Sequence, residues 1–115
     1  MRIRNVLQEY EAQLKPTPIA AATAGSASGK GEWKVYGNGT WQCKVWITGL
    51  NLSDGAVLQL AVSGHQFAEL LLSGGRARYR RESDRGEAVP EVEPKQLLQA
   101  SYAGQVILEG EFYSE

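Results

Sequence analysis

The chain has 115 residues, a length that suits one domain with a single hydrophobic core. Twelve basic and thirteen acidic side chains nearly cancel, so overall charge gives no reason to expect nucleic acid or an anionic membrane as a partner. The one cysteine, Cys43, excludes an intramolecular disulfide, and Cys43 with the single His65 is too few ligands for a zinc site of these residue types. No apolar run approaches the ~20 residues that span a bilayer, so we expect no membrane partner.

Apolar residues near the start of the chain follow helical spacing. They are Ile3, Val6, Leu7, Tyr10 and Leu14, with glutamates and glutamines on the other side. This spacing predicts a short amphipathic helix that Pro16 and Pro18 end. A helix of this length is marginal alone in water, so its apolar stripe is expected to dock on something. Residues 15–31 are predicted to be a linker that lets the helix reach a distant face or a neighbouring subunit.

The same segment has only part of the pattern of a signal peptide. Arg2 and Arg4 suit the positively charged start of such a peptide, but Glu9 and Glu11 interrupt the apolar stretch that should follow. We therefore expect a retained segment and a cytoplasmic protein.

From Gly31 onward the apolar residues recur with a period of two, which is typical of strands. The clearest strand is 41–50, which points Trp41, Cys43, Val45 and Ile47 to one side and Gln42, Lys44, Trp46 and Thr48 to the other. Shorter strands are predicted at 32–36, 58–63, 66–72, 76–81, 97–102 and 105–113.

Two of these strands bear on the composition of the core. In 66–72 the inner face is ambiguous, because both Phe67 and Leu70 are expected to be buried. In the last strand Val106, Leu108, Gly110 and Phe112 are predicted to share the inner face.

About seven short strands with turns every 8 to 12 residues are typical of a sandwich or small barrel. We predict a mainly β protein: an antiparallel β-sandwich, immunoglobulin-like in architecture, over residues 29–115. The helix and linker are predicted to precede it as a separate segment over residues 1–28.

The turn and strand residues also form one continuous series of short motifs over about residues 29–113. Asp-Gly precedes an apolar strand, followed by Gly-Gly-x-Ala, Gly-x-x-Val-Pro-x-Val and a closing Ile-Leu-x-Gly-x-Phe. The matching residues are Gly49, Leu50, Asp54, Gly55, Gly74, Gly75, Ala77, Gly86, Val89, Pro90, Val92, Ile107, Leu108, Gly110 and Phe112. In these residues the chain resembles an uncharacterised bacterial β-sandwich domain. The resemblance carries over no catalytic residue, and it implies export as the alternative location, because such units often occur in exported proteins.

Five arginines lie within residues 76–85. On a strand, Arg76, Arg78 and Arg80 share one face. One interpretation is a stripe that binds an anion or nucleic acid, with Tyr79 or Trp46 available for stacking. The other is a solvated strand face balanced by the interleaved acidic residues. The second is favoured, and nucleic acid is the less expected partner, because opposite charges across strands are the ordinary arrangement.

Trp46 is predicted on the outer face, where a large aromatic usually needs cover. The N-terminal helix or another subunit could supply it, or Trp46 could be a platform for a small molecule or sugar. His65 lies in a turn without a recognisable catalytic pattern, and Cys43 is expected to be a buried, inert thiol. We therefore predict no catalytic residue, no metal site and no cofactor.

Three hypotheses about function follow. The leading one is a non-enzymatic interaction or structural module that forms a homo-oligomer, using the apolar helix residues and Trp46. The second is a sandwich that binds a small ligand or carbohydrate through Trp46 and Tyr79. The third is an anion or nucleic-acid binder that uses Arg76, Arg78 and Arg80.

Overall fold

The structure is a computed structural model that describes residues 5–20 and 24–115. Eight antiparallel strands form one sheet in the order β5-β4-β7-β8-β1-β2-β3-β6. The strands are β1 (Val6–Pro16), β2 (Ser28–Tyr36), β3 (Trp41–Thr48), β4 (Val57–Val62), β5 (His65–Leu71), β6 (Ala77–Glu82), β7 (Leu97–Tyr102) and β8 (Gln105–Ser114). Two short 3₁₀ turns, η1 (Pro18–Ala20) and η2 (Ser83–Arg85), follow β1 and β6.

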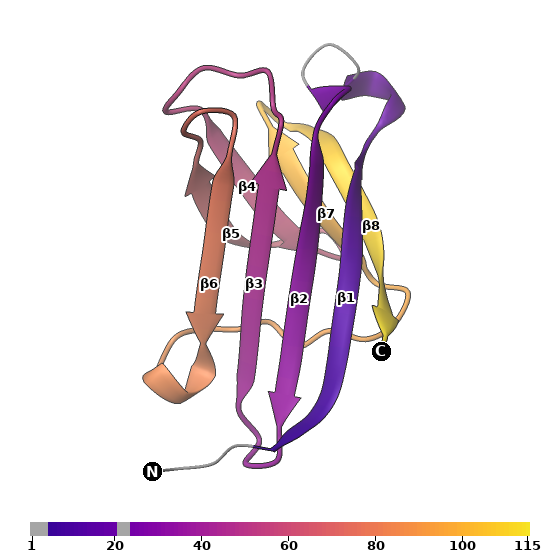
Figure 1. Ribbon diagram of the computed structural model, residues 1–115, viewed down its shortest axis with the longest axis vertical. Coiled ribbons are helices and arrows are strands. Elements are labelled where there is room, and N and C mark those ends of the chain that lie inside the picture. Colours follow the sequence, from indigo (N-terminus) through magenta and orange to yellow (C-terminus); the bar gives the residue numbers. More distant parts are fainter. Residues whose placement is uncertain (1–4, 21–23) are drawn as a thin grey trace.

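The sheet folds back on itself into a nearly closed barrel with two facing layers (Figure 1). Strands β6, β3, β2 and β1 form one layer, and β5, β4, β7 and β8 form the other. The hydrogen-bonded pairing of β1 with β8 joins the layers. The prediction of a mainly β, antiparallel protein is confirmed. The predicted immunoglobulin-like sandwich is not what the structure has, because β1 continues the sheet from β8 to β2 instead of leaving two separate sheets.

The predicted N-terminal helix is wrong, because residues 6–16 form strand β1. This strand lies in the middle of the sheet order and pairs with β2 on one side and β8 on the other. Ala12 and Leu14 point into the core and are fully buried, while the intervening Gln13 is exposed. Pairing with two neighbours stabilises the extended backbone and outweighs a local helical pattern.

The apolar residues expected on one helix stripe have different surroundings. Leu14 is buried, and Tyr10 is half-buried with its ring stacked on Trp41 at 6.2 Å between centroids. Val6 and Leu7 are exposed, Leu7 to 68%. Ile3 lies outside the described residues. The N-terminal segment is therefore part of the sheet and not a separate arm, and the residues from 28 onward that were assigned to the linker already belong to β2.

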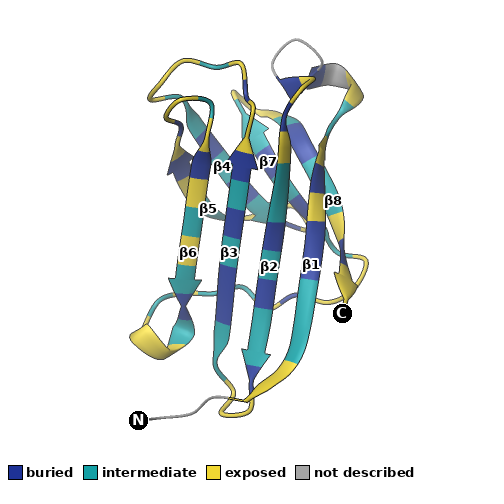
Figure 2. Cartoon of the chain, viewed as in Figure 1, coloured by how far each residue is buried: buried dark blue, intermediate teal, exposed yellow. Residues whose placement is uncertain are grey.

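The core fills the space between the layers, where the inward positions of the strands are buried (Figure 2). Trp33 lies at its centre and is fully buried, with its ring 4.9 Å from Phe112 and 6.1 Å from Phe67 between centroids. Its Nε1–H donates a hydrogen bond of 2.9 Å to the carbonyl of Pro90. Trp33 thus fills the core and also anchors the connection between β6 and β7, in which Val92 is buried.

A β-bulge in β5 resolves the ambiguity about its inner face. Leu60 of β4 pairs with Ala68, but the next residue of β4 pairs with Gln66, so Phe67 is an extra residue in β5. A bulge re-aims side chains along the strand. Phe67 therefore packs on the core along with Leu70, and its ring meets Tyr79 of β6 edge to face at 5.9 Å.

A second bulge changes the predicted inner face of β8. Ala100 of β7 pairs with Leu108, and Ser101 pairs with Val106, which leaves Ile107 as the extra residue. Ile107 and Leu108 are both buried, although they are adjacent. Val106, predicted inside, is only half-buried and lines the outer surface with Ser101.

Candidate anion-binding face

The pairing of β3 with β6 places basic side chains beside Trp46. In register, Trp46 lies opposite Arg78, and Lys44 lies opposite Arg80. Because side chains alternate across a sheet, these four point outward while Val45 between them is buried. We call Lys44, Trp46, Arg78 and Arg80 the Trp46 face.

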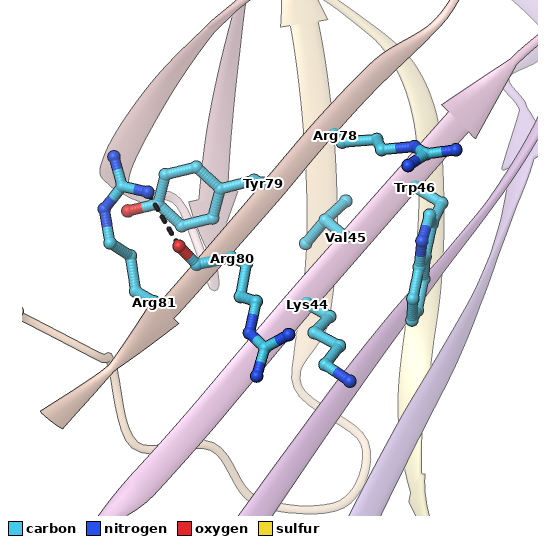
Figure 3. Close-up of a pocket in the computed structure, with 7 residues that line it drawn as sticks. All are labelled: Lys44, Val45, Trp46, Arg78, Tyr79, Arg80 and Arg81. Carbon is cyan, nitrogen blue, oxygen red and sulfur yellow. Dashed lines mark hydrogen bonds between the residues drawn. The ribbon is translucent and has the colours of Figure 1, made fainter. Parts of the chain in front are cut away.

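The Trp46 face forms an open depression of about 420 Å³. In Figure 3 the Arg78 guanidinium lies beside Trp46 at one end, and the Arg80 and Lys44 side chains lie next to each other at the other end. A smaller depression of about 240 Å³ lies on the other side of Trp46, where β2 contributes Lys30 and β3 contributes Thr48. Trp46 thus stands between two neighbouring hollows on the outer surface of the sheet.

A buried carboxylate neutralises part of the positive charge. Glu82 at the end of β6 is buried, and its side chain accepts a 3.0 Å hydrogen bond from Gln42 Nε2. The Glu82 carboxylate lies 3.2 Å from Arg85 Nε and 3.6 Å from Arg80 Nη2. The balance of opposite charges expected for the arginine stretch is therefore found at Arg80 and Arg85.

Arg78 and Lys44 differ from these two arginines. Among the described residues, neither has a carboxylate within ion-pair distance. The seven residues outside the description contain no aspartate or glutamate. Glu32 of β2 lies opposite Lys44 in register, but beyond ion-pair distance and paired with other lysines. Two cations that form no ion pair with a described carboxylate therefore flank the Trp46 ring, and they give the face a local positive charge that the nearly neutral composition hides.

Tyr79, predicted as a possible stacking residue, faces the other side of β6. It pairs with the buried Val45, its ring contacts Phe67, and the Arg81 guanidinium lies 4.4 Å from its centroid. Burial raises the pKa of the Tyr79 hydroxyl. Trp46 is therefore the aromatic side chain available on the outer face of β3 and β6.

The predicted site residues come together only in part. Arg78 and Arg80 join Trp46 on one face, and the exposed Arg76 lies just before β6, where it forms an isolated bridge with Ser73. The helix that was expected to cover Trp46 does not form, and Trp46 is half-buried among its neighbours on the strands. Lys44 was not singled out in the sequence. Its position two residues before an outward tryptophan was the signal that could have found it.

Cys43 and His65 do not extend this site. Cys43 is fully buried, and desolvation by burial raises the pKa of its thiol to about 11, which disfavours the reactive thiolate. His65 is exposed at the start of β5, opposite Val62 of β4. Both residues lie off the Trp46 face.

A separate polar cluster fastens β1 to β8. Glu11 is only 6% exposed, and it accepts hydrogen bonds from Tyr113 Oη at 2.5 Å and Gln13 Nε2 at 3.1 Å, with Lys30 Nζ at 2.6 Å. The carboxyl of Glu115 also hydrogen-bonds to Glu11. That bond, with Lys30 and Tyr113, lowers the pKa of Glu11 to about 2. The same contact raises the pKa of Glu115 to about 7.

This cluster predicts that Glu115 titrates near pH 7. Its pKa in the folded protein lies above its ordinary value of 4.5, so protonated Glu115 stabilises the fold at lower pH and this contribution is lost as pH rises through about 7. For Glu11 the sign is opposite, because its folded pKa is depressed, and its contribution is lost as pH falls toward about 2. Carboxyl-carbon NMR of Glu115 measures the titration.

Glu11→Gln should return the Glu115 titration toward its ordinary value, because it removes the neighbouring carboxylate. Glu111→Gln, at an exposed position of β8, is the control and should leave it unchanged. An ordinary Glu115 titration in the unmodified protein would contradict the raised pKa of Glu115.

No known family model and no curated protein matches this sequence. The resemblance to a bacterial β-sandwich domain therefore stays a prediction. Within residues 5–20 and 24–115, no helix is long and apolar enough to cross a membrane.

Proposed function

We propose that the protein is a non-enzymatic binding domain that holds an anionic ligand on the Trp46 face. The observation that carries this proposal is the placement of Arg78 and Lys44, neither of which forms an ion pair with a described carboxylate, beside a half-buried tryptophan. Guanidinium and ammonium groups donate charge-assisted hydrogen bonds to phosphate, sulfate and carboxylate. The tryptophan adds a flat apolar surface against which a ligand group can pack.

Self-association through the N-terminus has lost its main support. The amphipathic helix that was to dock on a neighbouring subunit is strand β1, which pairs on both edges within one chain. A homo-oligomer stays a prediction, and sedimentation of the purified protein tests it. Binding of a small neutral sugar has only Trp46 in its favour, because Tyr79 faces the core side.

Binding of inorganic polyphosphate is expected to depend on Arg78. Arg78→Glu should weaken it by roughly tenfold or more, because it removes a charge-assisted contact and adds a repulsion. Titration calorimetry gives the affinity, and NMR of the Trp46 indole and of the β3 and β6 amides locates the site.

Lys95→Glu is the matched control, because it makes the same charge change at an exposed position in the connection between β6 and β7. It should alter the affinity by less than about twofold, as expected for a distant charge at physiological salt. Equal losses in the two variants would show that only net charge matters and would refute the site.

A further inference from the structure

We infer that the anionic ligand is a single-stranded nucleic acid, with one base stacked on Trp46 and its phosphates on the basic side chains of β6 and β3. This inference rests on the proposed function. It names the chemical class of the ligand, and it predicts a role for the tryptophan ring that a simple anion would not need.

The shape of the surface favours a chain over a compact small molecule. Small-molecule sites usually enclose most of the ligand. Here the depression of about 420 Å³ lies open on a strand face, and the hollow of about 240 Å³ continues beyond Trp46. A linear polymer can cross such a surface with only part of each unit in contact.

The basic residues form a line along one edge of the sheet. Alternate residues of a strand are about 6.8 Å apart, so Arg76, Arg78 and Arg80 extend over roughly 14 Å. Lys44 lies opposite Arg80 on β3, which is one strand farther from the edge than β6. Guanidinium groups match phosphate oxygens in a bidentate geometry, so this line suits a phosphodiester backbone that runs along β6.

The charge differs on the two sides of Trp46. On the β6 side lie Arg78 and its basic neighbours. On the β2 side Lys30 is already held by Glu11 at 2.6 Å and Glu32 at 3.6 Å. Lys34 lies 3.9 Å from both Glu32 and Glu9, so two lysines of β2 face three carboxylates. An anionic backbone is therefore favoured along β6 and disfavoured over β2.

A nucleic-acid strand has this same asymmetry. Its charges follow one edge, and its flat, uncharged bases project from the other. With the backbone on β6, a base would project over β3, where the Trp46 ring lies. Proteins that bind single strands combine a basic track with aromatic platforms in this manner. A sulfated polysaccharide carries charge on both sides of its chain, and a duplex keeps its bases stacked and inaccessible.

The test uses an oligothymidylate of about ten nucleotides, within the usual range of site sizes. Anisotropy titrations at several salt concentrations should give a slope of log K against log salt between about −2 and −3, as expected for three or four phosphate contacts. Trp46→Ala should weaken binding by roughly tenfold or more, because a stacked base is lost. Trp46→Leu, which keeps apolar cover on the sheet, should show a similar loss if the variant is folded by circular dichroism.

An abasic strand, a duplex and a sulfated polysaccharide distinguish a failure of this inference from a failure of the proposed function. An abasic strand of equal length should bind more weakly, and Trp46→Ala should not change its affinity. If the abasic strand binds as tightly as the oligothymidylate, or if a duplex or a sulfated polysaccharide binds more tightly, the single-strand inference is wrong and the proposed anion site stands. If none of these polyanions binds to the full chain, the proposed function is wrong as well.

Discussion

Gly110→Ala is expected to destabilise the protein by about 3 kcal/mol. Gly110 lies in β8 opposite β1, and a Cβ atom at this position would be 2.0 Å from the backbone oxygen of Gln13. Backbone cannot move away as a flexible side chain can, so the two strands would have to separate locally. Their pairing is the connection between the two layers of the barrel, and damage there affects the whole fold.

Urea denaturation of the variant measures this loss. The matched control is Gly37→Ala, because a Cβ atom there would have its nearest neighbour at an ordinary 3.7 Å. We expect the control to change the free energy of unfolding by less than about 1 kcal/mol. If the two variants have equal stability, the close approach of β1 and β8 is not the reason for glycine at position 110.

Trp33→Ala should have a still larger effect, about 4 kcal/mol. The substitution removes the largest fully buried side chain and its edge-to-face contacts with Phe112 and Phe67. It also leaves the carbonyl of Pro90 without its hydrogen-bond donor. Since small domains have a total stability of about 5–15 kcal/mol, this variant should lose a large share of its stability.

Trp33→Phe separates the two contributions. It keeps an aromatic ring in the core but cannot donate to Pro90, so we expect a smaller loss of about 2 kcal/mol. Trp46→Leu on the outer face should cost less than about 1 kcal/mol. Thermal and urea unfolding compare the three. A loss below about 1.5 kcal/mol for Trp33→Ala would contradict its central place in the core.

The inward and outward faces of β3 could be predicted from the sequence. Cys43, Val45 and Ile47 are buried and Trp46 points outward, as alternation from residue 43 onward requires, whereas Gln42 on the outward side is buried against Glu82. Shifting such a strand by one residue would expose every apolar side chain at once, so the local pattern alone selects the face. The same argument placed Arg76, Arg78 and Arg80 together.

The conformation of the N-terminal segment could not be predicted in this way. Residues spaced by four, such as Tyr10 and Leu14, share a face in a helix and also in a strand. Only the neighbours β2 and β8, which supply hydrogen bonds along both edges, select the strand. The bulges at Phe67 and Ile107 likewise depend on the partner strands, because a bulge is a mismatch between two registers.

In the candidate site, too, some properties follow from the sequence and others only from the tertiary structure. The sequence by itself determined which chemical groups are present and which strand face each one occupies, because those properties depend on residue type and on alternation within one strand. Only the tertiary structure decided that Trp46 lies beside Arg78, since the register between β3 and β6 is set by hydrogen bonds between segments far apart in the chain. It also decided which cations keep their charge uncompensated. Glu82 is held close to Arg80 and Arg85, and no described carboxylate reaches Arg78.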